Sequence, residues 1–111
     1  NICPLLKLGT YNNLGNLWRA KGNLQQAQFA YKKVLKIDPN FTTGYYNLGI
    51  TLKAMGQFVE AIAAYEKAIQ LNPDYAQAYQ NLGVTLLKIG KVSEGLKWFQ
   101  PVRQFGGISK L

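Results

Sequence analysis

The amino-acid sequence predicts an all-α fold in which pairs of antiparallel helices stack along the chain as a solenoid. The tripeptide Asn-Leu-Gly starts at positions 13, 47 and 81, so it returns at a constant interval. Between these markers, apolar residues fall three and four positions apart, which is the spacing of one helix face. Glycine and proline recur at fixed phases and divide the chain into segments of helix length. A period of about 34 residues is typical of helical solenoids.

The repeat divides residues 8–109 into three consecutive units of equal length. Aligned on Asn-Leu-Gly, the units are 8–41, 42–75 and 76–109, and we expect them to form a single domain over residues 1–111. Tyrosine and glycine return in the same columns, as Tyr11, Tyr45 and Tyr79 and as Gly22, Gly56 and Gly90.

The middle unit shows how each unit is expected to form two helices. Apolar residues at helical spacing predict a first helix over residues 42–55 and a second over 57–71. Gly56 should end the first helix in a left-handed conformation. Pro73 should end the second, because the residue before a proline avoids helical dihedral angles. The connections are only a few residues long, so the two helices must run antiparallel.

Small residues are expected where the two helices of a unit meet. A glycine inside a helix costs about 1 kcal/mol relative to alanine, so Gly49 and its equivalents need a compensating role. We expect these glycines and the small residues at the Ala61 position to let the two helix backbones approach closely. Large apolar neighbours would then bury their side chains beside the contact, each contributing about 1.5–3 kcal/mol.

Both ends, residues 1–7 and 101–111, depart from the repeat. The first helix is expected to begin near Leu5, because proline suits a helix start. Pro101 falls where the last helix should continue, so that helix should stop or kink near Phe99–Gln100. Gly106-Gly107 then favours an irregular tail. No polar capping helix is visible, which favours association of the apolar ends with another copy or another part of the parent protein.

The combined pattern resembles the tetratricopeptide repeat, or TPR, over residues 8 to about 100. The first unit has Val34 at the Ala68 position, and the third has Gly95 at the Ala61 position. The resemblance implies a right-handed α-α superhelix whose first helices line a concave groove for a peptide or partner helix. In the middle unit the pattern is carried by Tyr45, Leu48, Gly49, Leu52, Gly56, Ala61, Tyr65, Ala68 and Pro73.

The resemblance also implies which side chains should line the groove. The Leu-Gly stripe is expected to face inward, which leaves the neighbouring positions of each first helix for the ligand. These positions are Asn12, Asn13, Asn16 and Arg19 in the first unit, Thr43, Tyr46, Asn47, Ile50 and Lys53 in the second, and Gln77, Gln80, Asn81, Val84 and Lys88 in the third.

Asn13, Asn47 and Asn81 are expected to form a ladder along the groove. We do not expect helix packing to require an asparagine here, and an amide can donate to and accept from a peptide backbone at once. The ladder is similar to that in the TPR superhelix of O-linked N-acetylglucosamine transferases. The alternative is that the three amides meet only water.

A second family site is not expected here. Some TPR domains hold the C-terminal carboxylate of heat-shock chaperones with two asparagines and three basic residues. Asn16 and Asn47 occupy the asparagine places, but the three basic places hold the uncharged residues Asn12, Gln77 and Asn81. A carboxylate needs charge-assisted hydrogen bonds there, so chaperone-tail binding is not predicted.

The formal net charge of +8 favours an acidic partner. Lys32, Lys33 and Lys36 fall on the outer face of a second helix, where we expect only solvent. Arg19, Lys53 and Lys88 should instead lie near the groove, where they favour an acidic peptide. Binding of RNA by a helical-repeat array is a further alternative, although the Leu-Gly and alanine pattern is not that of the RNA-reading repeats.

Several function classes are excluded by composition. The chain has no histidine and only Cys3, so it offers no metal cluster, no internal disulfide and no histidine base, and no cofactor or catalytic activity is expected. No apolar run approaches the ~20 residues that span a membrane. The resemblance implies a protein-interaction module, and the single cysteine fits a reducing compartment, so we expect this module to be cytoplasmic. The alternative is an accessory domain that positions substrates for a larger enzyme such as a glycosyltransferase or methyltransferase.

Overall fold

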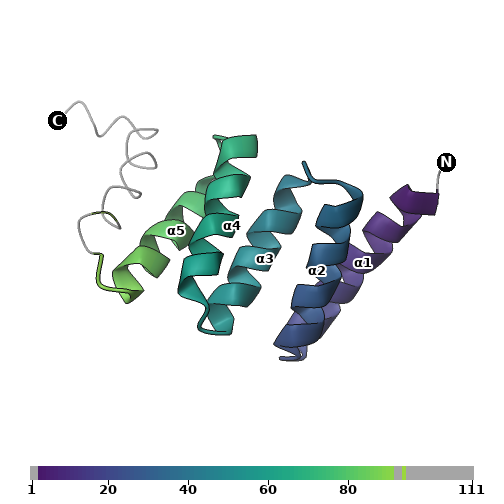
Figure 1. Ribbon diagram of the computed structural model, residues 1–111, viewed down its shortest axis with the longest axis horizontal. Helices are drawn as coiled ribbons and strands as arrows, with labels where there is room; N and C mark the ends of the chain where they lie inside the picture. The colour runs from purple at the N-terminus through teal and green to yellow at the C-terminus, as the bar shows by residue number, and fades with distance from the viewer. Residues whose placement is uncertain (1–2, 92–93, 95–111) are drawn as a thin grey trace.

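The computed structural model describes residues 3–91 and Glu94, and this part of the chain forms an all-α helical-repeat solenoid (Figure 1). Each short connection reverses the direction of the chain, so consecutive helices pack as antiparallel neighbours. The helices are α1 (Cys3–Ala20), α2 (Leu24–Ile37), α3 (Thr42–Ala54), α4 (Phe58–Leu71) and α5 (Ala76–Lys88).

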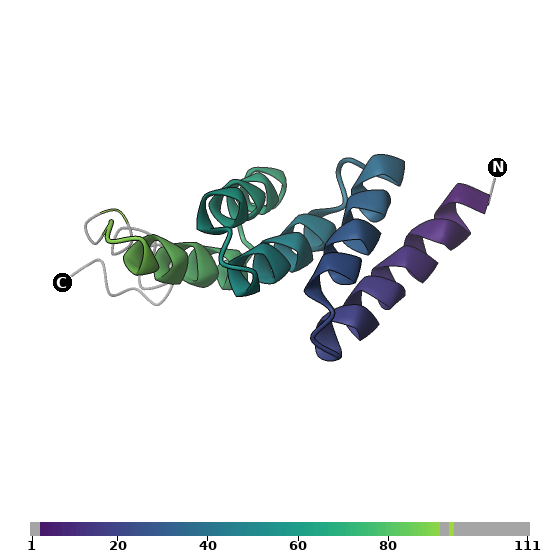
Figure 2. The ribbon, with the colours of Figure 1, turned by 60° about the horizontal axis from the view of Figure 1, so that its bottom comes forward.

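The helices form two layers. Figure 2 shows α1, α3 and α5 in one layer, with α2 and α4 in the other. Neighbours within the first layer touch, since α1 contacts α3 and α3 contacts α5. In the second layer, α2 and α4 have no Cα atoms within 8 Å of each other over their described lengths. The array is therefore closed on the side of α1, α3 and α5, which we call the first-helix face, and open on the other side.

Glycine ends each first helix, as the sequence predicts for Gly56. Its φ angle is 81°, and Gly22 and Gly90 adopt 82° and 85° at the equivalent points. The Gly56 N–H donates to the Lys53 carbonyl, and the following residue, Gln57, donates to the Leu52 carbonyl at 2.9 Å. These bonds satisfy carbonyl groups that a helix end would otherwise leave unpaired.

The Asx-Pro segments build the turns between units. The Asp38 carboxylate accepts from the Asn40 N–H at 3.0 Å, and the Asn72 amide oxygen accepts from the Asp74 N–H at 3.1 Å. The Tyr45 hydroxyl then donates to the Pro39 carbonyl at 2.9 Å, so the first helix of the middle unit is tied to the turn before it. Both contacts recur in the next turn, where the Tyr79 hydroxyl donates to Pro73.

The helix boundaries expected from sequence agree closely with the structure. The helices predicted over 42–55 and 57–71 are observed as Thr42–Ala54 and Phe58–Leu71. The first helix begins at Cys3, slightly before the expected start at Leu5. Apart from Glu94, the second helix expected for the third unit lies outside the described residues, as do Gly95, Pro101 and the glycine-rich tail.

The contact that requires glycine involves an aromatic ring rather than a neighbouring backbone. A Cβ atom on Gly49 would lie 2.6 Å from Cε1 of Tyr65, and one on Gly15 would lie 2.5 Å from the same atom of Tyr31. Both tyrosines are fully buried. Each glycine therefore makes room for the ring of the second helix, and the ring fills the space beside the buried Ala61 or Ala27.

The inward direction expected for the Leu-Gly stripe holds in the second and third units and for Gly15 in the first unit, but it is wrong for Leu14. Leu48 and Leu82 are 8% and 0% exposed, but Leu14 is 37% exposed. The difference arises because α2 covers α3 and α4 covers α5, whereas no described helix covers the corresponding face of α1. Leu17 is exposed on this same face of α1. Association of the chain through its apolar ends stays a prediction.

Candidate functional site

Side chains of α1 and α3 meet on the first-helix face through their asparagines. The Asn47 amide nitrogen donates to the Asn12 side-chain oxygen over a long 3.5 Å. Asn47 is only 7% exposed. Its neighbour one turn on, Thr51, is fully buried and donates its hydroxyl to the Asn47 carbonyl. Asn47 is therefore part of the helix contact as well as of the polar surface.

Asn81 makes three hydrogen bonds, and two of them join α5 to α3. Its amide nitrogen donates to the Tyr46 hydroxyl at 3.0 Å and to the Gln77 carbonyl at 3.0 Å. Its side-chain oxygen accepts from the Lys53 ammonium at 2.8 Å. This amide thus fixes a hydroxyl and a cation of the preceding first helix, and it ties the two units together across the face.

A separate cluster within the first unit holds Arg19. The Tyr31 hydroxyl comes from α2 and donates to the Asn16 side-chain oxygen at 2.6 Å. The Nε of Arg19 donates to that same hydroxyl at 3.2 Å. Because Tyr31 is fully buried, its hydroxyl holds the Nε atom of Arg19 in a fixed position on the face.

Aromatic rings support the centre of the face. The Tyr46 ring lies 5.0 Å from the Tyr75 ring and 6.1 Å from the Tyr65 ring, between centroids, and both pairs are tilted. The sequence analysis placed Tyr65 in the repeat pattern and overlooked Tyr75. The available signal was the aromatic residue at the same position of the first two units, Phe41 and Tyr75.

Burial and like charge shift the pKa values of the groups at this centre. Loss of solvent, and secondarily repulsion from Lys88, lower the pKa of Lys53. Loss of solvent, followed by the neighbouring phenol of Tyr75, raises the pKa of Tyr46. The three helices of the face contain no aspartate or glutamate over their described lengths. Lys53 therefore lacks the carboxylate that would offset its loss of solvent.

All fourteen residues expected at the groove lie on α1, α3 or α5, but their environments differ. Hydrogen bonds join Asn12 to Asn47, and Tyr46 and Lys53 to Asn81, whereas Ile50 packs against the core. The exposed residues are Asn13, Thr43, Gln77, Gln80, Val84 and Lys88. The half-buried residues are Asn12, Asn16, Arg19, Tyr46, Ile50, Lys53 and Asn81, and the one buried residue of the set is Asn47.

The three asparagines of the expected ladder are not equivalent. Asn13 is exposed, Asn47 is buried, and Asn81 already makes three hydrogen bonds within the chain. The expectation that helix packing does not require these amides is therefore wrong for Asn47 and Asn81, because both connect neighbouring first helices. Their binding of a ligand stays a prediction.

Two features are absent from the described residues: a cluster of side chains of the usual metal-binding types, and a bilayer-spanning helix. No group of three or more potential side-chain ligands (His, Cys, Asp or Glu) occurs in that part of the chain. None of its helices combines the length and the apolar character needed to cross a membrane.

A buried hydroxyl distinguishes the second unit from the first. The hydroxyl of Tyr65 is buried without a hydrogen-bond partner among the described residues, whereas that of Tyr31 donates to Asn16. Ile50 occupies the Asn16 position of the second unit, and its side chain cannot accept a hydrogen bond. Burial, followed by the neighbouring phenol of Tyr46, raises the pKa of Tyr65, consistent with a hydroxyl that stays protonated and unpaired.

Removing the two hydroxyls should have different effects on stability. We expect Tyr65→Phe to leave the free energy of unfolding unchanged or raise it by up to ~1 kcal/mol, because an unsatisfied buried group is lost. Tyr31→Phe should lower it by about 0.5–1.5 kcal/mol, because Asn16 and Arg19 lose their partner. Urea unfolding followed by circular dichroism measures both values, and an equal loss in the two variants would contradict this account of the unpaired hydroxyl.

Known protein families and structures match this arrangement. A family model described as TPR repeat matches residues 51–90, and two described as tetratricopeptide repeat match residues 10–41 and 30–63, so that together they cover 10–90. No curated protein matches the sequence significantly.

Solved structures share the same helix arrangement. The TPR2B domain of yeast Sti1, in complex with pHsp70, superposes with a TM-score of 0.86 at 25% identity, covering 89% of this chain and 79% of that one. The protein MamA gives 0.86 at 28% identity, over 94% of this chain and 61% of MamA. A mutant O-GlcNAc transferase of Thermobaculum terrenum gives 0.83 at 21% identity, over 90% of this chain and 19% of the transferase, a likeness of fold alone. The chain belongs to the tetratricopeptide repeat family.

Proposed function

We propose that this protein is an interaction module whose first-helix face binds an extended, acidic peptide segment of another protein. The observation that carries the proposal is the charge of that face. The helices α1, α3 and α5 contain no acidic residue, but they carry Lys7, Arg19, Lys53 and Lys88. A face with one sign of charge attracts ligands of the opposite sign and raises their rate of association.

Lys53 and Lys88 are the cations that we expect to gain most from an acidic ligand. The lowered pKa of Lys53 means that its surroundings destabilise the charged ammonium, because solvent is partly excluded and Lys88 repels it. A ligand carboxylate placed between the two ammonium groups would offset both effects. It would also form charge-assisted hydrogen bonds, which are stronger than those between neutral groups.

The likeness to the TPR2B domain of Sti1, whose structure contains pHsp70, supports a protein or peptide ligand for this chain. The positions that would hold a chaperone carboxylate are uncharged here, so we do not propose that ligand. Asn13, Thr43 and Gln80 are exposed, so their polar side chains are accessible to a peptide backbone. They would bind the peptide alongside Lys53 and Lys88.

RNA is the competing ligand class, because the same basic face would attract phosphates. Recognition of single-stranded bases relies on aromatic side chains that are free to stack. Tyr46 is not free, since its ring lies against Tyr65 and Tyr75 and its hydroxyl is bonded to Asn81. We therefore favour the peptide. A role as the substrate-positioning domain of a larger enzyme would use the same peptide-binding face.

The proposal predicts the kind of peptide that the protein selects. Selection from a random peptide library displayed on phage should enrich sequences with aspartate or glutamate, and their binding should weaken as salt is raised. Fluorescence anisotropy of labelled synthetic peptides measures this dependence. Enrichment of neutral or basic peptides, or affinities that do not change with salt, would contradict an acidic ligand. Tighter binding of single-stranded RNA than of any selected peptide would favour the competing class.

A further inference from the structure

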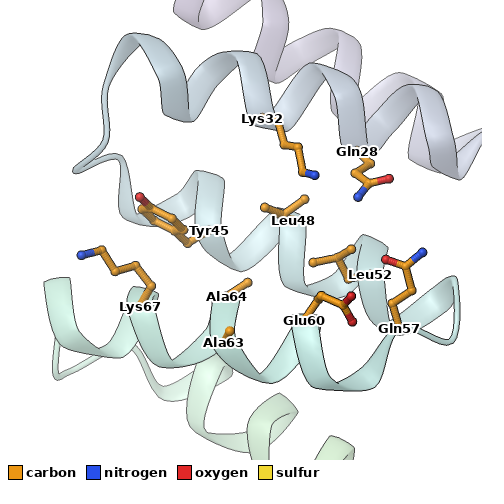
Figure 3. A pocket seen from close by; sticks show the side chains of 10 residues that line it. All are labelled: Gln28, Lys32, Tyr45, Leu48, Leu52, Gln57, Glu60, Ala63, Ala64 and Lys67. Carbon is orange, nitrogen blue, oxygen red and sulfur yellow. The ribbon is translucent and has the colours of Figure 1, made fainter.

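A recess lies between α2 and α4, on the opposite side of the molecule from the first-helix face. It has a volume of about 360 Å³, and α3 forms its floor (Figure 3). Leu48 and Leu52 from α3 and Ala64 from α4 are less than 10% exposed and give the floor an apolar surface. The Tyr45 ring, held by its hydroxyl on the Pro39 carbonyl, stands at one end. We call this recess the α2–α4 cleft.

The cleft exists because α2 and α4 diverge and because a small residue lines it. The two helices have no Cα atoms within 8 Å over their described lengths, so side chains alone could fill the space between them. On α4 the lining includes Ala63, which is exposed. The equivalent position of the preceding unit, on α2, holds Phe29. A phenylalanine in place of Ala63 would occupy the cleft.

Polar side chains surround the apolar floor, and none of them is committed to another group. Gln28 and Lys32 extend from α2, Glu60 and Lys67 extend from α4, and Gln57 immediately precedes α4. None of the five has a hydrogen-bond or ion-pair partner for its side chain among the described residues. On the first-helix face, by contrast, Arg19, Lys53 and several of the amides already have hydrogen-bond partners. An apolar recess with a few free, convergent polar groups is typical of a ligand site.

The two ends of the cleft differ in charge. Figure 3 shows Lys67 beside Tyr45 at one end, Lys32 above Leu48 near the middle, and Glu60 and Gln57 toward the other end. The α2 helix carries no acidic residue that would offset Lys32. A ligand would therefore meet cations at one end and along α2, and a hydrogen-bond acceptor at the other end.

We propose that the α2–α4 cleft binds a peptide of a partner protein that inserts one large apolar side chain and places an adjacent carboxylate against Lys32. The volume suits one or two large side chains. Gln28 and Gln57 on opposite walls can both donate to and accept from a peptide backbone. The Glu60 carboxylate in the wall would repel a chain of phosphates, which disfavours a nucleic acid at this place.

The first test uses short synthetic peptides as probes. An acetylated and amidated peptide with one tryptophan flanked by aspartates is titrated into isotope-labelled protein, and amide chemical shifts are followed by NMR. Two matched peptides replace the tryptophan with alanine or the aspartates with asparagine. We expect the largest shifts in α2, α4 and the middle of α3, with binding about tenfold or more weaker for the alanine peptide. The asparagine peptide should bind several-fold more weakly and with less dependence on salt.

Variants of the protein then locate the site. Ala63→Phe fills the cleft at an exposed position and should weaken binding about tenfold or more. Lys32→Glu should weaken it, whereas Lys36→Glu makes the same change of charge on the same helix outside the lining and should have a smaller effect. Lys53→Glu on the first-helix face should leave this binding within about twofold, which separates the cleft from the site proposed above.

Three outcomes would overturn the proposal for the cleft. One is full affinity of Ala63→Phe, with circular dichroism showing it folded. Another is equal binding of the tryptophan and alanine peptides, or no binding of either. The last is a set of shifts confined to α1 and α5, which would assign the peptide to the first-helix face instead.

Discussion

Replacing Gly49 with leucine should lower the free energy of unfolding by about 1–3 kcal/mol, which is typical of an overpacked core. Even a Cβ atom at this position would lie 2.6 Å from Cε1 and 2.7 Å from Cδ1 of Tyr65. The ring is fully buried and cannot swing into solvent, so the backbone or the neighbouring helix must move. Thermal unfolding measures the effect, at about 4–8 °C per kcal/mol for a domain of this size.

Gly9 provides a matched control for this effect. It also lies inside a first helix, but a Cβ atom there would meet nothing within 4 Å. Gly9→Ala should therefore raise stability by up to ~1 kcal/mol through helix propensity alone. Gly49→Ala should lower stability despite the same gain in propensity. Similar stabilisation in the two alanine variants would mean that the glycine does not serve to accommodate the tyrosine ring.

Reversing the charge of both Lys53 and Lys88 should weaken binding of a selected acidic peptide by about 10–100-fold, or roughly 1.4–2.7 kcal/mol. The expected loss is large because Lys53 is partly buried and screened less by salt than an exposed lysine. A ligand carboxylate would lose its partner and meet a like charge in its place. Anisotropy titration with a labelled peptide measures the change.

The control reverses two other lysines of the same chain. Lys33→Glu with Lys36→Glu produces the same change of net charge on α2, away from the first-helix face. This control should lose much less affinity, mainly through slower association. Equal losses in the two double variants would show that net charge, rather than the position of Lys53 and Lys88, governs binding.

The fold could be predicted from the sequence because its signals are local and repeated. Gly56 and Pro73 ended their helices as expected, since Gly56 acts through its own backbone dihedral angles and Pro73 through those of the residue before it. The inward direction of Leu48 followed from helical spacing. The same pattern misplaced Leu14, because the burial of a repeated position depends on the helix that precedes it and not on the residue itself.

The candidate site could be predicted only as a set of positions. The sequence placed Asn47 and Asn81 on the correct helices, but their partners, Asn12 and Tyr46, each lie in the preceding first helix, one unit earlier in the chain. Such pairs depend on the distance between the first helices of successive units. The sequence pattern within one unit does not specify that distance. The α2–α4 cleft was missed for the same reason, and Lys32, expected to meet only solvent, lines it.

The central claim, that an acidic peptide lies along the first-helix face, is tested most directly by locating the bound peptide. A selected acidic peptide carrying a nitroxide spin label should broaden NMR signals of nearby amides in the labelled protein. The account predicts broadening around Thr43, Gln80 and Val84, which are exposed on α3 and α5. Broadening confined to α2 and α4, with these three signals unchanged, would contradict it.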